Sequence, residues 1–180
     1  MYGMVNKAVF DMVHAYFGKD AWTAISKAAG VEDDTFLSMR QYPDEITYRL
    51  VSAASQELRI TPEQVLEAFG EYWVSYTARE GYGELLKLHG KTLLEFLGNL
   101  DAMHARVGLT FPELRPPSFH LSEKQARSVK LHYQSSRQGL AHLVVGLLRG
   151  LGSMLGTPVE VTILAKTVAQ EDTETFLLRW

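Results

Sequence analysis

Four side chains in the second half of the sequence could together hold a metal-containing ligand. His104 lies in an apolar stretch, and about thirty residues later Tyr133, Ser135 and Arg137 occupy alternate positions. A neutral imidazole can coordinate iron from one side. Hydroxyl and guanidinium groups donate hydrogen bonds to carboxylates. The four residues therefore indicate a buried ligand that carries both a metal and acidic substituents.

Helical spacing places His104 on a face that is otherwise apolar. The other members of this face are Leu93, Phe96, Leu97, Leu100, Met103 and Val107. An iron ligand is one interpretation of such a histidine. A core histidine whose ring is satisfied by a backbone carbonyl is the other, and spacing alone favours it.

The alternating pattern from residue 128 to 136 predicts a strand that places Tyr133, Ser135 and Arg137 on its inward face. Burial of a guanidinium and two hydroxyls is costly unless partners satisfy them. The pair of propionates of a haem would do so, while His104 reaches the iron. The alternative is a strand end at which Arg137 is solvated and Tyr133 only packs.

Composition limits the classes of protein that remain. The chain has 180 residues, 46% of them hydrophobic and 22% charged, with a net charge of -3, which predicts one folded domain, residues 1–180, that does not bind nucleic acid. Because there is no cysteine, a haem would be held non-covalently, as haem b. We expect no membrane span and no secretory signal, and hence a cytoplasmic protein.

The pattern of elements predicts an α+β fold, with a helical part over about residues 1–110 and a sheet-containing part over about 111–180. The expected helices run from residue 5 to Gly18, 20 to 30, 44 to 58, 61 to about 80, 84 to 88, 93 to 107 and 140 to 155. Further strands are expected over residues 159–163 and 176–178, and a solvated turn over the acidic run 171–174.

Several motifs, in order along nearly the whole chain, resemble the haem-nitric oxide/oxygen binding (H-NOX) family, which includes the haem domain of soluble guanylate cyclase. The matching stretches are Met1–Lys7, Phe69–Trp73, Leu100–His104, Arg115–Phe119 and Tyr133–Arg137. The pattern is most similar to stand-alone bacterial and cyanobacterial members. The resemblance implies a helical N-terminal subdomain and a C-terminal antiparallel sheet with helices, with haem buried between them.

The resemblance also implies roles for individual residues. His104 would be the proximal iron ligand, and Tyr133, Ser135 and Arg137 would bind the propionates. Pro117 matches a proline that presses on the porphyrin and distorts it.

Distal positions implied by the resemblance are mostly apolar, namely Val5, Val74, Leu143 and Leu147. Since bound dioxygen needs a hydrogen-bond donor, we expect nitric oxide and carbon monoxide binding with weak or no dioxygen binding. Trp73, also at a distal position, carries an indole donor, and His142 is next to Leu143; either could weaken this expectation.

We find no catalytic module, so a signal would pass by conformational change to a separate protein, which family analogy suggests is a sensor histidine kinase or a cyclic-dinucleotide enzyme. Two alternatives remain open. One is a haem protein that carries dioxygen or acts in redox chemistry, and the other is a helical interaction module without haem in which His104 and Arg137 are structural.

Overall fold

The computed structural model describes residues 1–31, 35–164 and 173–180, which form two compact units, residues 1–69 and 70–180. The helices are α1 (Gly3–Ala28), α2 (Asp44–Leu58), α3 (Pro62–Thr77), the π-helical turn η1 (Ala78–Tyr82), α4 (Gly83–Leu88), α5 (Leu93–Gly98), α6 (Leu100–Thr110) and α7 (Ala141–Met154). The strands are β1 (Ser118–Gln125), β2 (Ser128–Gln134), β3 (Glu160–Leu164) and β4 (Thr173–Arg179). Most helices precede the antiparallel sheet along the chain, with α7 between β2 and β3, so the predicted α+β class is confirmed. The single-domain organisation remains a prediction.

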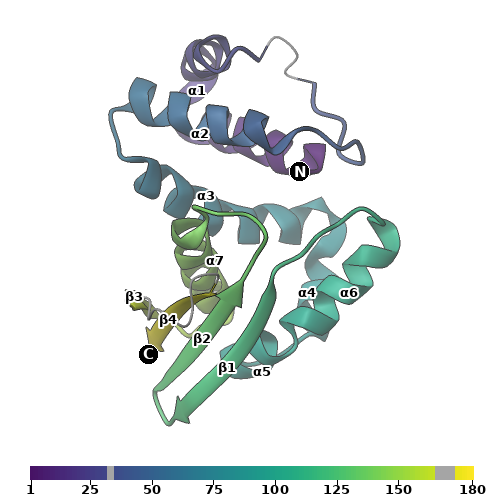
Figure 1. Ribbon diagram of the computed structural model, residues 1–180, viewed down its shortest axis with the longest axis vertical. Helices are drawn as coiled ribbons and strands as arrows, with labels where there is room; N and C mark the ends of the chain where they lie inside the picture. Colours follow the sequence, from purple (N-terminus) through teal and green to yellow (C-terminus); the bar gives the residue numbers. More distant parts are fainter. Residues whose placement is uncertain (32–34, 165–172) are drawn as a thin grey trace. The chain divides into compact units, whose positions relative to one another are not determined.

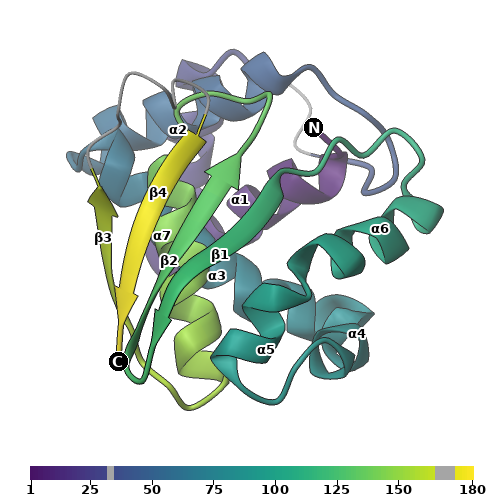
Figure 2. The ribbon, with the colours of Figure 1, turned by 60° about the horizontal axis from the view of Figure 1, so that its bottom comes forward.

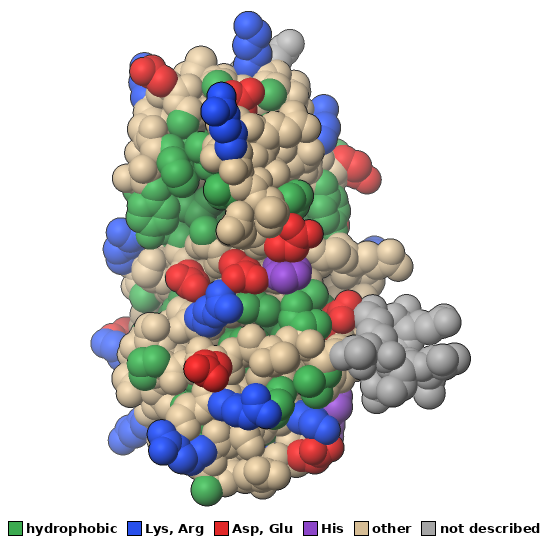
Figure 3. Space-filling view, turned by 90° about the vertical axis from the view of Figure 1, so that its left-hand side faces the viewer, with side chains coloured by type: hydrophobic (Ala, Val, Ile, Leu, Met, Phe, Trp, Pro, Cys, Tyr) green, Lys and Arg blue, Asp and Glu red, His purple; other side chains and the backbone are tan. Residues whose placement is uncertain are grey.

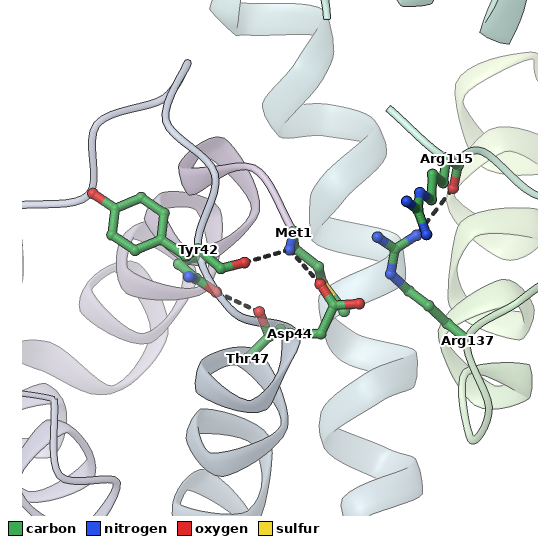
Figure 4. A network of polar contacts seen from close by, with 7 residues as sticks. Met1, Tyr42, Asp44, Thr47, Arg115 and Arg137 are labelled. Carbon is green, nitrogen blue, oxygen red and sulfur yellow. Dashed lines mark hydrogen bonds and ion pairs between the residues drawn. The ribbon is translucent and has the colours of Figure 1, made fainter. Parts of the chain in front are cut away.

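In residues 1–69, α1 and α2 pack side by side (Figure 1). Gly18, with φ 84° and ψ 178°, interrupts α1 where the sequence predicts an end. The residue that precedes α2 is Pro43, so Asp44 opens the helix and does not cap it as expected. The carboxylate of Asp44 instead forms an ion pair with the terminal ammonium of Met1 (Figure 4).

Helix α3 begins at the predicted boundary. The Thr61 N–H donates to Gln64 Oε1 at 2.9 Å, and the Gln64 N–H donates to Thr61 Oγ1 at 3.3 Å, which is a capping box. The helical run loses its α geometry in η1, where Gly81 adopts φ 95°. The expected break at the glycines near residue 81 is therefore confirmed.

The helix predicted over residues 93–107 is wrong as a single element. It divides at Asn99 (φ -104°, ψ 4°) into α5 and α6. The Asn99 side chain donates to the backbone oxygen of His89 at 2.8 Å, a contact that fixes the bend. Leu93, Phe96 and Leu97 on α5 are buried, whereas none of the residues of α6, all of which the structure describes, is buried.

The sheet is antiparallel with the strand order β1-β2-β4-β3, and α7 lies against one of its faces (Figure 2). Leu131 and Phe176, paired across β2 and β4, are fully buried beneath α7. Strand β1 was not predicted, because its exposed and half-buried residues do not alternate regularly. Glu174, expected in a turn, lies in β4, and residues 171 and 172 are outside the described residues.

Within the described part of the chain, no helix has the length and apolar character needed to cross a membrane. On the face drawn in Figure 3, acidic and basic side chains are interspersed and form no field of a single sign.

Candidate functional site

His104 projects from α6 with a half-buried imidazole. Its Nδ1 is buried and has no hydrogen-bond partner within the described residues. Burial lowers the pKa of His104, and the Asp101 carboxylate and the Pro117 backbone oppose that shift more weakly. The ring is therefore neutral at pH 7 and keeps the nitrogen lone pair that a metal requires.

Two contacts hold the first turn of α6 in place. The Phe119 N–H on β1 donates to Asp101 Oδ1 at 3.0 Å, and Asn99 is bound to the His89 backbone as described above. Asp101 precedes His104 by three residues, so the same carboxylate lies on the side of the helix that carries the imidazole. Asp101 thereby positions His104 against the sheet and raises the pKa of its ring.

Aromatic rings connect His104 with the carboxylate-binding candidates. The His104 and Phe119 ring centroids are 5.9 Å apart, and those of Phe119 and Tyr133 are 5.5 Å apart. Tyr133 also meets Phe176 of β4 edge-on at 6.3 Å. The structure thus brings His104 and Tyr133, which are on different elements, together in one aromatic cluster centred on Phe119.

Tyr133, Ser135 and Arg137 converge, as predicted, although not on a regular strand. Strand β2 ends at Gln134, so the expected strand to residue 136 is too long. Ser135 and Arg137 lie in the bend that follows, where Ser135 Oγ accepts from the Arg137 N–H at 3.1 Å. Tyr133 is 5% exposed and Arg137 is half-buried, and the inward burial of its guanidinium remains a prediction.

The neighbouring polar groups change the pKa of the Tyr133 hydroxyl. Burial raises the pKa of the Tyr133 hydroxyl, while a hydrogen bond with Ser135 and the charge of Arg137 partly offset this rise. The carboxylate of Glu174, opposite Tyr133 in the β2–β4 register, raises that pKa further. The phenol therefore stays protonated and available as a donor. The sequence interpretation missed Glu174 because strand register is not visible in the pattern of one strand.

Arg137 also contacts the segment that contains Pro117. Its Nη1 donates to the backbone oxygen of Arg115 at 3.0 Å (Figure 4). The Pro117 backbone raises the pKa of the His104 ring through a hydrogen bond. The segment 115–117 therefore connects the Arg137 guanidinium with the His104 imidazole. The structure brings four predicted residues, Tyr133, Ser135, Arg137 and Pro117, into one neighbourhood with His104.

The predicted distal residues on α3 and α7 occur where these helices pack closely. A methyl group at Gly70 would lie 2.3 Å from the Leu143 oxygen and 2.6 Å from the Leu147 nitrogen, so the two backbones are in contact. Trp73, Val74, Leu143 and Leu147 are each half-buried. Val5 is on α1, in the other unit, and its role remains a prediction.

The donor set fits a haem. A half-buried neutral imidazole with an unpartnered buried nitrogen suits an axial ligand. A protonated phenol, a serine hydroxyl and a guanidinium suit carboxylate substituents. Among the described residues, no group of three or more His, Cys, Asp or Glu side chains is placed to hold a metal ion.

Comparison with known proteins decides the family. The family model described as haem-NO-binding matches residues 2–163. The chain belongs to the H-NOX family. As a member, it is a haem-based gas-sensing domain. Membership of the family supports the haem that was predicted from His104 and the tyrosine–serine–arginine pattern.

Relatives with curated names are much longer than this H-NOX chain. Soluble guanylate cyclase gcy-32 of Caenorhabditis elegans is 32% identical over 152 residues, which are 83% of this chain and 22% of the relative. The beta-2 subunit of soluble guanylate cyclase from Rattus norvegicus is 37% identical over 103 residues, 57% of this chain and 15% of the relative. The chain therefore spans about a fifth of these relatives or less.

Solved structures share the fold across nearly the whole chain. A mutant of an H-NOX protein from S. oneidensis, in the Fe(II) ligation state, has a TM-score of 0.88 at 19% identity, covering 99% of this chain and 95% of that one. An oxygen complex of an oxygen-binding H-NOX domain has a TM-score of 0.78 at 16% identity, covering 99% and 93%. Because structures of different ligand states share this fold, the fold alone does not specify the gas.

Proposed function

We propose that this domain senses nitric oxide through a ferrous haem b bound by His104, with Tyr133, Ser135 and Arg137 as donors to the haem propionates. The observation that carries the proposal is the unpartnered, buried nitrogen of the neutral His104 ring, joined through Phe119 to the polar set around Tyr133. Haem supplies the iron at which a diatomic gas binds. The residues of the chain orient the cofactor and select the gas.

Selection against dioxygen is proposed to come from the wall made by α3 and α7. Val74, Leu143 and Leu147 carry no hydrogen-bond donor in their side chains, so they cannot stabilise the negative charge that dioxygen acquires on ferrous iron. Nitric oxide and carbon monoxide depend less on such a donor. We therefore propose binding of both gases with weak or no binding of dioxygen.

The half-buried Trp73 is the observation that favours a second candidate function. Its indole N–H is a donor on the helix that carries Val74. If that donor points to bound gas, the domain would carry dioxygen or take part in redox chemistry. A Trp73→Phe variant distinguishes the two, because it removes the donor and retains an aromatic ring.

We propose that gas binding changes the conformation of α6 and that this change is the signal. No residue of this helix is fully buried, and its contacts among the described residues, the packing of Leu100 and Met103 and the hydrogen bonds of Asn99 and Asp101, lie mostly in its first turn, to which the bond of His104 to iron would add. Loss of the last contact would free the helix beyond its first turn, which is a ligand-biased switch. We propose that a separate protein, a sensor histidine kinase or a cyclic-dinucleotide enzyme, reads this change.

Absorption spectra test the proposal with the full chain. The reduced protein is recorded alone, in air, and with nitric oxide or carbon monoxide. We expect a Soret band that shifts with the last two gases and not with air. A protein without a Soret band would refute haem binding, and a stable oxygen-bound spectrum would refute the gas preference.

Replacement of the proximal residue tests the ligand assignment. His104→Gly is expected to lose the native Soret shape, and free imidazole is expected to restore it by occupying the space that the side chain leaves. His120→Gly, at an exposed position of β1, serves as the matched control and should keep the native band. An unchanged band in His104→Gly would remove His104 from the iron.

A further inference from the structure

A second arginine lies beside Arg137 and was not among the predicted ligands. Arg115 precedes Pro116 and Pro117, and each proline restricts the backbone of the residue before it to extended conformations. The hydrogen bond from Arg137 Nη1 to the Arg115 oxygen, 3.0 Å long, fixes this extended segment against the guanidinium. The position of Arg115 is thus set by the same contacts that join Arg137 to Pro117.

Figure 4 shows the Arg137 side chain reaching the backbone of Arg115, so the two arginines are in contact. The Arg115 guanidinium makes no hydrogen bond or ion pair with a described residue. Both of these contacting residues carry a positive charge, and an anion bound by both would offset the repulsion between them. Two guanidinium forks are suited to carboxylates, which they can bind through two parallel hydrogen bonds.

The two negative charges of the haem propionates call for a second cation beside Arg137. A haem carries two propionates, and the set of Tyr133, Ser135 and Arg137 contains one positive charge. The phenol of Tyr133 remains neutral, and Ser135 carries no charge. One carboxylate would therefore lack a cationic partner unless another residue supplies it.

We propose that Arg115 binds the haem carboxylates together with Arg137 and completes charge neutrality at that edge of the cofactor. This inference rests on the proposed haem site and extends it by one residue. It assigns to Arg115 a direct contact with the cofactor, in addition to the role of its backbone in holding Arg137.

The rate at which the ferric protein loses haem to excess apomyoglobin tests this assignment. Arg115→Gln is expected to lose haem about twofold to fivefold faster than the wild type, the range typical of exposed ion pairs. Arg137→Gln should show a larger effect, because Arg137 is half-buried whereas Arg115 is exposed. Arg179→Gln, which removes the same charge from the exposed end of β4, is the matched control and should lose haem at the wild-type rate.

Haem dimethyl ester separates a direct contact from an effect on folding. This ligand keeps the iron and the porphyrin but has no carboxylates, so the difference between the wild type and Arg115→Gln should vanish with it. A difference that persists with the ester, or an Arg115→Gln rate equal to that of Arg179→Gln with ordinary haem, would overturn the role of Arg115 alone. A wild-type protein that binds no haem would overturn the proposed function and this inference with it.

Discussion

Replacement of Gly70 by alanine is expected to disturb the contact between α3 and α7. An added Cβ would lie 2.3 Å from the Leu143 oxygen, 2.6 Å from the Leu147 nitrogen and 2.8 Å from the Gly146 carbonyl carbon. All three atoms belong to backbone, so no flexible side chain can move aside. Overpacking of this kind costs about 1–3 kcal/mol. Alanine also has a higher helix propensity than glycine, by about 1 kcal/mol, which offsets part of this cost. The expected net loss in the free energy of unfolding is therefore about 0–2 kcal/mol. Because three backbone atoms lie under 3 Å from the added Cβ, we expect a value in the upper half of this range.

Urea unfolding of the haem-bound protein, followed by far-ultraviolet circular dichroism, measures this loss. Gly108→Ala is the control, because it also adds a methyl group to a helix but meets no atom within 4 Å. The control should be stabilised by up to about 1 kcal/mol. A Gly70→Ala protein stabilised as much as Gly108→Ala would show that the close approach of α3 and α7 is wrong. The carbon monoxide association rate should change in Gly70→Ala and not in Gly108→Ala, because only Gly70→Ala would move the backbone of α7 at the proposed distal wall.

Three further results are expected. Asp101→Ala should lower the free energy of unfolding by about 0.5–1.5 kcal/mol, since it leaves the Phe119 N–H without its acceptor; equal urea midpoints for variant and wild type would count against the contact. Thr61→Ala should cost about 1 kcal/mol through loss of the α3 cap, measured by the same assay, and no change would show that the cap is not formed in solution. The pKa of Glu95 is lowered from 4.5 by hydrogen bonds from the backbone of residues 91 and 92, so its stabilising effect is complete above pH 4.5 and is lost as the pH falls through the lower folded-state value. Glu95→Gln should therefore show a smaller decrease in urea midpoint than the wild type on acidification, and parallel decreases would contradict the shift.

The helices were largely predictable because their signals are local. The capping box at Thr61 and the glycine at position 18 mark boundaries that the structure confirms. The break at Asn99 was missed because the apolar spacing continues across it. Its cause is a hydrogen bond to His89, ten residues away in the sequence, although the adjacent Gly98 and Asn99 are residues that often end helices.

The sheet was less predictable, because strand pairing is not local. Strand β1 has no regular alternation, and its place beside β2 is set by cross-strand pairs such as Leu121 with Leu131. The same register puts Glu174 opposite Tyr133, which changes the electrostatics of the site. A single strand read by itself cannot reveal its partner, so the acidic residue was assigned to a turn.

The predicted polar residues come together although the local geometry expected for them was wrong. Strict alternation would hold Tyr133, Ser135 and Arg137 apart on one face of a strand, each pointing in the same direction. The bend after Gln134 instead lets the Ser135 hydroxyl accept from the Arg137 backbone while it also interacts with the Tyr133 hydroxyl. A bend can aim donors from several directions at one group, whereas a flat strand face presents them in a row. This geometry also leaves Arg137 half-buried, with its guanidinium bound to the Arg115 backbone oxygen.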